Sequence, residues 1–401
     1  MKIRVFFKNK NRMVKLEELF EAYFDCRSNK RNTSNALAFE IDYESNLIEL
    51  QNDLNNKTYK IGKSIAFIVN KPVKREIFAA DFRDRVVHHF LINKLNPLFE
   101  KEFVRNSYSC RIGKGTHHGI HKVDGFIRKC SKNYTKDCYI LKLDIRGFFM
   151  HIDKMVLVDK LTKFMNEKYL KDDKEFVLEL FKQIIFNKPT ENCIIKSKPN
   201  EWDDLPKDKS LFFSKANSGL PIGNLTSQII ANFYLNCFDH FVKYDLKIKY
   251  YGRYVDDFII IHEDKKYLKS LINILTTYLQ KELGLVLHPK KIYLQHYSKG
   301  VKFLGSVIKP NRIYIANRTK GNFYNAIQKQ NSVANDHKPN KSEILNFLCS
   351  MNSYLGIMKH YKTHKLKKNL ILKYLSQQWL RHVHLSYDTY KFIKNKIKKS
   401  K

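Results

Sequence analysis

The sequence predicts an α+β fold made of two or three packed units. Its 401 residues are enough for several hydrophobic cores. Some segments repeat apolar residues at helical spacing, whereas others are short β-branched or aromatic runs typical of strands. These two kinds of segment alternate too irregularly for a doubly wound parallel sheet. The class is therefore α+β.

The expected elements follow from these patterns in chain order. Helical spacing predicts helices over residues 13–27, 81–91, 227–241 and 344–358. Short apolar runs predict strands over residues 61–69 and 139–143, and a hairpin over 251–261. The polar insertion 188–215 predicts a loop. No internal repeat and no linker rich in Gly, Ser or Pro divides the chain.

The charge balance is strongly basic. Lysine and arginine number 74 against 39 acidic residues, a formal net charge of +35, and the excess is spread from end to end. A distributed surplus of this size favours a long polyanionic partner such as nucleic acid. A basic surface without a dedicated partner and a membrane-binding surface are the alternatives that charge alone leaves open.

The cysteines and the apolar runs indicate the cellular environment of the protein. The chain carries seven cysteines, without a CxxC pair or zinc spacing, which predicts reduced intracellular thiols. The opening residues 1–12 lack the apolar core of a signal peptide. No run approaches the roughly 18 apolar residues of a membrane span. A soluble protein without a membrane partner is expected.

The run YGRYVDDFIII, residues 251–261, places Asp256 and Asp257 inside a strand-favouring stretch. Aspartate is a poor strand residue, so a tight turn between two strands explains the pair in structural terms alone. The pairs at 172–173 and 203–204 lie among charged or turn-forming neighbours and predict solvated surface. The doublet itself is therefore weak as a functional signal.

A third carboxylate changes the interpretation. Asp144 ends the apolar strand of LKLDIRGFF, and if this strand lies beside the hairpin, Asp144 and Asp256 converge. Clustered carboxylates repel one another unless they are protonated or bound to cations, and Mg²⁺ prefers oxygen ligands. Two such ions activate a hydroxyl and stabilise a leaving pyrophosphate. With the basic charge this predicts phosphoryl transfer on nucleic acid, by a polymerase or a two-metal nuclease.

The ordered motifs resemble those of reverse transcriptases. LKLDIRGFF and YVDD are similar to the two catalytic blocks of that family, and the remaining blocks follow in order over residues 71–307. They read KPVKREIFAADFRDRVVHHFL, SYSCRIGKGTHHGI, GLPIGNLTSQIIANFYLN, LGLVLHPKKIYL and VKFLGSVI. The resemblance implies a right-hand polymerase fold. It divides the chain into an N-terminal helical extension (1–70), fingers and palm (71–308) and a helical basic thumb (309–401).

The middle block resembles one subfamily. Group II intron and retron enzymes carry Gln-Gly after the proline, whereas here Pro221 is followed by Ile222 and Gly223, and the block ends Ser227-Gln228. This form is similar to the reverse transcriptases of diversity-generating retroelements. Their activity is to copy a template-repeat RNA into cDNA, with errors at template adenines, for mutagenic retrohoming. A defence-type enzyme, of the abortive-infection or retron-like kind, is the alternative.

The resemblance assigns a catalytic and metal-binding centre. Asp144, Asp256 and Asp257 match the family's triad and are expected to bind two Mg²⁺ ions, with the backbone carbonyl of Ile145 as a further ligand. Intact acidic residues argue against a non-enzymatic RNA-binding module.

Two further residues concern the incoming nucleotide. Phe149 is expected to lie under the sugar and to exclude ribonucleotides, although a core phenylalanine, as expected for Phe148, is the structural alternative. Ile222 stands where the commoner pattern has a glutamine. Since isoleucine can only pack, its presence predicts weaker discrimination near the nascent base pair.

The remaining site assignments also come from the resemblance. The substrate-binding set adds Arg83 and Arg111 at the triphosphate, Gly223, and Lys291, with neighbouring Lys290 as its alternative. Arginine suits bidentate phosphate contacts, and a solvated basic face is the alternative. The nucleic-acid-binding set consists of Arg75, Arg85, Lys114, Gln228, Phe303 and Gly305.

The expected partners are template RNA, the cDNA primer or product, and dNTPs. The resemblance adds a basic, pentameric helical accessory protein and a cytoplasmic location in a bacterial, phage-encoded or archaeal setting. No RNase H, protease, integrase or zinc-finger endonuclease domain is expected. DNA integration is therefore expected to depend on other proteins.

Overall fold

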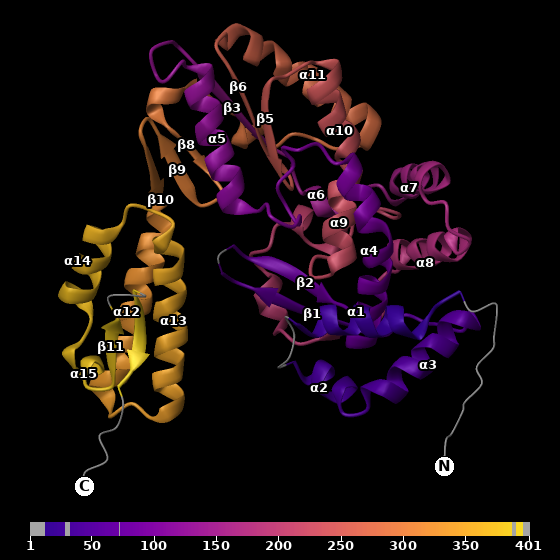
Figure 1. Cartoon of the computed structure of the whole chain (residues 1–401), viewed down its shortest axis with the longest axis horizontal. Coiled ribbons are helices and arrows are strands. Elements are labelled where there is room, and N and C mark those ends of the chain that lie inside the picture. Colours follow the sequence, from indigo (N-terminus) through magenta and orange to yellow (C-terminus); the bar gives the residue numbers. More distant parts are fainter. Residues whose placement is uncertain (1–12, 29–32, 72, 387–389, 396–401) are drawn as a thin grey trace. The chain divides into compact units, whose positions relative to one another are not determined.

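The computed structural model describes residues 13–28, 33–71, 73–386 and 390–395. The expectations for residues 1–12 and for the basic tail 396–401 lie outside the described residues. The chain divides into two compact units. The first takes in segments up to residue 115, from 142 to 260 and from 266 to 293, and the second comprises 116–141, 261–265 and 294 onward. Figure 1 shows the elements of both units.

The first unit begins with a helical layer. Its members are α1 (Leu16–Ser28), α2 (Ser34–Glu40), α3 (Tyr43–Asn55) and α4 (Phe82–Glu102). Tyr23 of α1 and Phe39 of α2 both pack against Phe82 at the start of α4. The helix predicted over 81–91 continues to Glu102 through Pro97, because Leu95 and Phe99 are fully buried and hold the additional turns.

A small sheet follows, which we call the β1 sheet, with strand order β2-β1-β4. Its strands are β1 (Ser64–Val69), β2 (Arg75–Ala79) and β4 (Cys193–Ile195). β2 is antiparallel to β1 and β4 is parallel to it. The loop predicted over 188–215 is therefore only partly a loop. It supplies β4 and then short 3₁₀ turns at Pro199–Trp202, Lys207–Lys209 and Leu211–Phe213.

Helices of the middle segment follow one another closely. They are α6 (Phe148–His151), α7 (Lys154–Lys168), α8 (Lys174–Phe186), α9 (Leu225–Tyr234) and α10 (Asn236–His240). The single helix predicted over 227–241 breaks at Leu235 and ends in a π-helical turn, Phe241–Asp245. Phe233 of α9 packs against Phe99 of α4, so α9 and α4 share one core.

A second sheet, which we call the aspartate sheet, has strand order β5-β6-β3-β7. It contains β3 (Tyr139–Asp144), β5 (Tyr250–Tyr254), β6 (Asp257–His262) and β7 (Tyr293–His296). β3 lies next to β6 (Figure 1), which confirms the expected proximity of the two acidic blocks. Phe238 of α10 packs against Phe258 of β6. Buried leucines line one face of α11 (Lys265–Leu283).

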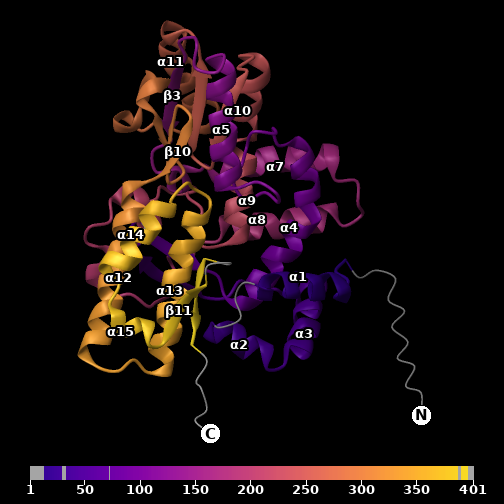
Figure 2. The ribbon, with the colours of Figure 1, turned by 60° about the vertical axis from the view of Figure 1, so that its left-hand side comes forward.

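The second unit combines helices with short hairpins. It contains α5 (Thr116–Cys130), β8 (Val301–Phe303), β9 (Ser306–Lys309), β10 (Arg312–Ile315), α12 (Asn317–Asp336), α13 (Lys341–Lys359), α14 (His364–Tyr374), α15 (Gln377–Leu380), β11 (Val383–Ser386) and β12 (Lys391–Lys394). α12 lies between α13 and α14 (Figures 1 and 2). Phe323, Phe347, Met351 and Trp379 are central to their core. The helix predicted over 344–358 is confirmed as part of α13.

Within the described residues, no helix combines the length and the apolar character needed to cross a membrane.

Trp379 offers a test of the second unit's core. Its side chain is 0 % exposed, stacks on Phe347 with ring centroids 4.3 Å apart, and donates a hydrogen bond to the Gln330 carbonyl at 3.0 Å. Trp379→Ala is expected to lower the free energy of unfolding of this unit by about 3–5 kcal/mol. Leu380→Ala, at a side chain 50 % exposed, is the matched control and should leave it nearly unchanged. Equal urea midpoints for the two variants would contradict this.

Candidate active site

The turn between β5 and β6 has an unusual backbone. Val255 and Asp256 form the two-residue loop of the hairpin, and Val255 has φ of +57°. A β-branched residue rarely adopts this left-handed conformation, and such strain costs about 1–3 kcal/mol. The surrounding structure must therefore hold the turn in place.

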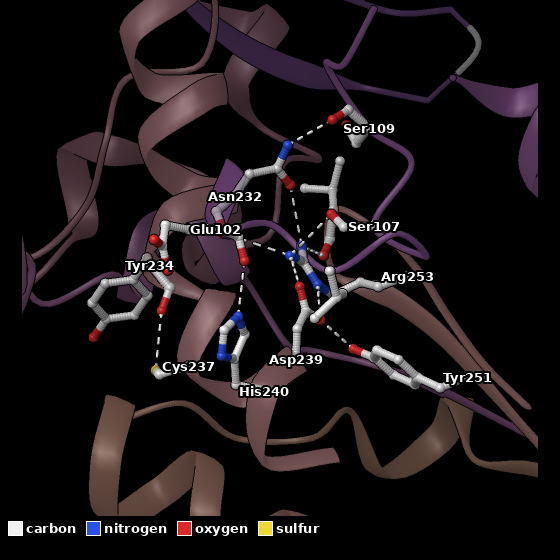
Figure 3. A network of polar contacts seen from close by, with 12 residues as sticks. Glu102, Ser107, Ser109, Asn232, Tyr234, Cys237, Asp239, His240, Tyr251 and Arg253 are labelled. Atoms are coloured by element: carbon white, nitrogen blue, oxygen red, sulfur yellow. Dashed lines mark hydrogen bonds and ion pairs between the residues drawn. The ribbon is translucent and has the colours of Figure 1, made fainter. Parts of the chain in front are cut away.

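A buried ion pair supplies that restraint (Figure 3). The Arg253 guanidinium donates through Nε and Nη2 to the two carboxylate oxygens of Asp239, at 2.7 and 2.6 Å. Both side chains are 0 % exposed. The remaining nitrogen, Nη1, donates to the Val255 carbonyl at 2.8 Å. The fork of Arg253 thus links α10 to the backbone that immediately precedes Asp256.

Other buried groups complete what we call the Arg253 network, which consists of Arg253, Asp239, Asn232, Ser107 and Tyr251. The guanidinium also donates to Asn232 Oδ1 at 3.2 Å and Ser107 Oγ at 3.3 Å, and the Tyr251 hydroxyl donates to the Asp239 carboxylate. Because Asn232 belongs to α9, the network connects the hairpin to the helix that contains Ser227 and Gln228.

The charge state of the network is set by its members. Burial alone would lower the pKa of Arg253, but the Asp239 carboxylate more than offsets this, and the pKa lies above its usual value. Burial and the same carboxylate raise the pKa of Tyr251. Near neutral pH the arginine is therefore charged and the tyrosine hydroxyl is a donor.

The three predicted acidic residues converge beside this turn. The Ile145 amide donates to the Asp256 carbonyl at 3.2 Å and thereby joins the end of β3 to the hairpin. Asp144 is 14 % exposed. Burial, and secondly the Asp144 charge, raises the pKa of Asp256 to about 6. Burial raises the pKa of Asp257 to about 6 as well, against the opposing effect of Lys142.

Two lysines lie against this acidic group. Lys291 Nζ is 2.8 Å from Asp144 Oδ1, and Lys142 Nζ is 3.1 Å from an oxygen of Asp257. Arg75 is close enough to Asp256 to oppose the rise in its pKa. These cations neutralise the carboxylates only in part, since the pKa values of Asp256 and Asp257 remain high.

The donor set fits a hard divalent cation. All its side-chain ligands would be carboxylate oxygens, and a bound cation would relieve the repulsion that raises the Asp256 pKa. In the described part of the chain, no group of three or more His, Cys, Asp or Glu side chains is already arranged as a metal site. One oxygen each of Asp144 and Asp257 contacts a lysine, Lys291 and Lys142 respectively.

The other two aspartate pairs behave differently. Asp172, Asp203 and Asp204 are exposed, as predicted. Asp173 is not solvated surface, because its side chain is mostly buried in an ion pair with Lys94 at 2.8 Å. The prediction was wrong there because the partner lysine comes from α4, far away in the sequence.

Phe149 and Ile222 meet in one apolar cluster. Both pack, partly buried, against Ala66, Phe78 and Met150, together with Leu211. The Phe78 amide donates to the Ile222 carbonyl at 2.8 Å. Phe148, by contrast, is buried, in agreement with the core position expected for it. The structure therefore brings together the two residues that the sequence assigned to the nucleotide.

Gly223 is required by its surroundings. Its φ is +128°, and a Cβ would lie 2.8 Å from Ile77 Cγ2 and 3.2 Å from the Phe78 carbonyl oxygen. Any side chain at this position would push the IGxxxSQ motif away from β2.

The two arginines expected at the triphosphate have protein partners. Arg111 is 4 % exposed and donates through Nε to Glu100 at 2.9 and 3.0 Å and through Nη1 to the Val104 carbonyl. Arg83 pairs with Asp53. Either arginine would have to exchange these partners to bind a phosphate, so their substrate role stays a prediction.

The expected nucleic-acid residues are dispersed. Arg85 donates to the Ala80 carbonyl at 2.8 Å, and Lys114 donates to the Arg105 carbonyl at 3.1 Å. Burial, and secondly Arg111, lowers the pKa of Lys114 to about 8. Arg75 and Gln228 are exposed. In the second unit, Phe303 is buried and Gly305 lies in the β8–β9 turn with φ of +80°. Their roles stay predictions.

Three residues that contact or support the candidate site were not predicted from the sequence: Arg253, Asp239 and Lys142. A signal existed for Arg253, since it alternates with Tyr251 on one face of a strand whose other residues are apolar. A charge at such a position requires a buried partner. No local pattern identifies Asp239 as that partner.

A hairpin carrying two acidic residues, next to a strand that ends in a third, defines the palm of a nucleic-acid polymerase. Residues 70–308 match the family reverse transcriptase (RNA-dependent DNA polymerase). This match covers more than half of the chain, and the chain belongs to the reverse transcriptase family. The right-hand polymerase fold and the enzyme class predicted from the sequence are thereby confirmed.

The chain is similar to several known proteins. It is 23 % identical over 160 residues to protein YkfC of Escherichia coli K12, covering 40 % of this chain and 35 % of that protein. It is 30 % identical over 87 residues to nuclear intron maturase 1, mitochondrial, of Arabidopsis thaliana, covering 22 % and 11 %. The chain thus spans about a third or less of these curated relatives.

Among solved structures, telomerase from Candida albicans in complex with a fragment of telomeric RNA matches with a TM-score of 0.45 and 12 % identity, over 84 % of this chain and 63 % of that one. Apo telomerase from Candida tropicalis matches with a TM-score of 0.46 and 14 % identity, over 78 % and 56 %.

The Arg253 network predicts a catalytic defect from a charge-conserving change. Arg253→Lys keeps a cation beside Asp239 but cannot also reach the Val255 carbonyl, so the turn that carries Asp256 should shift. A displacement of about 1 Å at a reacting centre costs about 100-fold in rate. We expect kcat for nucleotide incorporation to fall by about that factor, with little change in KM.

The control is Arg105→Lys, at an exposed arginine of the same unit. It should behave like the wild type. An Arg253→Lys protein that is folded and fully active would rule out the positioning role.

Proposed function

We propose that the chain is an RNA-directed DNA polymerase that copies a template-repeat RNA into cDNA by two-metal nucleotidyl transfer. The observation that carries the proposal is the convergence of Asp144, Asp256 and Asp257 at the end of the aspartate sheet, in a chain of the reverse transcriptase family. Two bound Mg²⁺ ions would activate the primer 3′-hydroxyl and stabilise the leaving pyrophosphate.

The chain's own residues divide the work. Asp144 and Asp256 would hold the cations, and the Ile145 carbonyl would be a further oxygen ligand. Asp257, whose carboxylate contacts Lys142, acts less directly and shapes the charge of the site. Lys291, whose Nζ lies 2.8 Å from Asp144 Oδ1, is the proposed proton donor to the departing pyrophosphate. The surplus of +35 charges favours binding of template and product backbones.

Phe149 selects the sugar in this proposal. Its ring packs on one side against the apolar cluster and keeps part of its surface accessible. A ring supported on one side is suited to exclude a 2′-hydroxyl on the other, because a close-packed cluster cannot retreat from it. Deoxynucleotides would be accepted and ribonucleotides rejected.

The subtype proposed is that of a diversity-generating retroelement. Ile222 packs in the same cluster as Phe149 and offers no hydrogen-bonding side chain there. Sites that discriminate through hydrogen bonds can be far more selective than sites that discriminate through shape. An apolar residue at this point supports error-prone synthesis opposite adenine, and thus mutagenic retrohoming.

The same proposal implies further partners. These are a structured template RNA, dNTPs and a basic pentameric accessory protein, acting together in the cytoplasm of a bacterial, phage-encoded or archaeal system. The three-part division into an extension (1–70), fingers and palm (71–308) and thumb (309–401) belongs to this proposal.

Asp256→Ala tests the polymerase. It should abolish cDNA synthesis on a primed RNA template while leaving RNA binding intact, since the substitution removes one metal ligand and no phosphate contact. A readout independent of activity is the melting temperature. MgCl₂ should raise it for the wild type, as binding to the native state does, by about 2–4 °C per kcal/mol.

The variant should lose this shift. Asp172→Ala, at an exposed aspartate, is the matched control and should retain both activity and shift. Substantial cDNA synthesis by Asp256→Ala would contradict the proposal.

Ile222→Gln tests the subtype. Restoring an amide beside the incoming nucleotide should make synthesis opposite template adenine more accurate, by about tenfold if one hydrogen bond of roughly 1–1.5 kcal/mol is gained. Sequencing of cDNA from a fixed template measures the change. Ile222→Leu, which keeps an apolar side chain, should retain the wild-type error spectrum. Identical spectra for all three proteins would refute this role of Ile222.

A further inference from the structure

Residues 188–215 separate two catalytic blocks in the sequence, and the proposed function assigns them no task. Yet a buried carboxylate anchors this segment to the β1 sheet. Glu76 of β2 is 1 % exposed and accepts hydrogen bonds from Trp202 Nε1 at 2.7 Å, Ser210 Oγ at 2.7 Å and the Leu211 amide at 2.5 Å. A buried charge with three donors fixes the direction of the chain that supplies them.

The anchored segment reaches the nucleotide cluster. Leu211 is buried together with Ala66, Phe78 and Met150, and Phe149 and Ile222 pack on this group. Leu211 therefore has two contacts: its amide binds Glu76, and its side chain belongs to the cluster against which both residues assigned to the nucleotide pack.

A second contact joins the segment to the catalytic block. Arg146 Nε donates to Asp208 Oδ2 at 2.9 Å, and this bond lowers the pKa of Asp208. Gly147 has φ of +54°, and a Cβ there would lie 2.5 Å from the Asp208 carbonyl oxygen. The chain between Asp144 and Phe149 and the 3₁₀ turn of Asp208 are thus in close backbone contact.

We propose that residues 202–211 form a wall that positions the Phe149 ring, so that Leu211 and Glu76 determine sugar selectivity without touching the nucleotide. The inference rests on the proposed role of Phe149. Leu211 limits how far the ring can withdraw, and Glu76 holds Leu211 in place. Both are positioning residues.

The physical basis is the density of a protein interior. Close-packed side chains give way only when a neighbour is removed, and a Leu→Ala change leaves a cavity into which a ring can move. Movement of Phe149 toward that cavity would make room for a 2′-hydroxyl. The effect should appear as a lower KM for ribonucleotides, because binding of the larger sugar improves while the metal-binding residues are unchanged.

The experiment compares single-nucleotide incorporation of dNTP and rNTP by the full chain and its variants. Shape-based discrimination spans about 10–200-fold. Phe149→Ala should remove about 100-fold of it and Leu211→Ala about tenfold, chiefly through KM. Glu76→Gln, which turns an amide N–H group toward donors, should act in the same direction. Leu211→Met should keep the wild-type selectivity, since methionine fills the space that Leu211→Ala leaves empty.

The control lies on the same segment. Phe213 is 60 % exposed, and Phe213→Ala should leave selectivity unchanged. Relaxed sugar selectivity in Phe149→Ala, with unchanged selectivity in folded Leu211→Ala and Glu76→Gln, would refute the wall formed by residues 202–211 and would leave the proposed role of Phe149 intact. If Phe149→Ala also has no effect, the role of Phe149 fails first. Should Leu211→Ala not fold, Leu211→Val decides by the same ratio, an unchanged ratio counting against the wall.

Discussion

The ion pair between Arg253 and Asp239 is the constraint on which the catalytic geometry depends. Removing two charges from water costs several kcal/mol each, so a buried pair of this kind is weak as a source of stability. The contribution of this pair here is to orient the groups that it binds. The planar fork uses two nitrogens on Asp239 and still has Nη1 for the Val255 carbonyl, at 2.8 Å. Apolar residues of equal volume could fill the same space, but they could not hold a β-branched residue at φ of +57°. The position of Asp256 therefore follows from hydrogen-bond geometry.

Buried carboxylates on the two sides of the β5–β6 hairpin are compensated in opposite ways. At Asp239 the carboxylate is compensated by the Arg253 guanidinium and by the Tyr251 hydroxyl, which both donate to it. At Asp256 and Asp257 compensation is incomplete, and the pKa of each carboxyl rises to about 6. The first arrangement gives rigidity, because every buried polar group has its partner. At Asp256 and Asp257 the negative charge is not fully neutralised, although the chain as a whole carries a large positive net charge. A rigid support under an under-neutralised carboxylate group is what a cation-dependent transfer site needs.

Sequence reasoning recovered what depends on local pattern or on motif order. The helix α1, the strand that ends at Asp144 and the hairpin around Asp256 follow from periodicity, and the proximity of the two acidic blocks follows from the motif resemblance. It failed where long-range packing decides. The helix predicted over 81–91 extends to Glu102, because Leu95 and Phe99 are buried. The segment 188–215 looked like a polar loop, because the residue that fixes it, Glu76, lies more than a hundred positions earlier. Asp239 likewise gave no sign of its partner.

The anchoring of Glu76 has a consequence for biogenesis. Its hydrogen-bond donors lie 126, 134 and 135 residues further along the chain, whereas Arg253 finds Asp239 only 14 positions away. During synthesis from the N-terminus, β2 emerges with a carboxylate that cannot be buried until residues 202–211 have left the ribosome. Loop closure over such a span is slow compared with local pairing. The β1–β2 hairpin can pair locally, but β4 and the donors to Glu76 join it only after the intervening helices have been synthesised, and the free edge of β1 is accessible to chaperones until then.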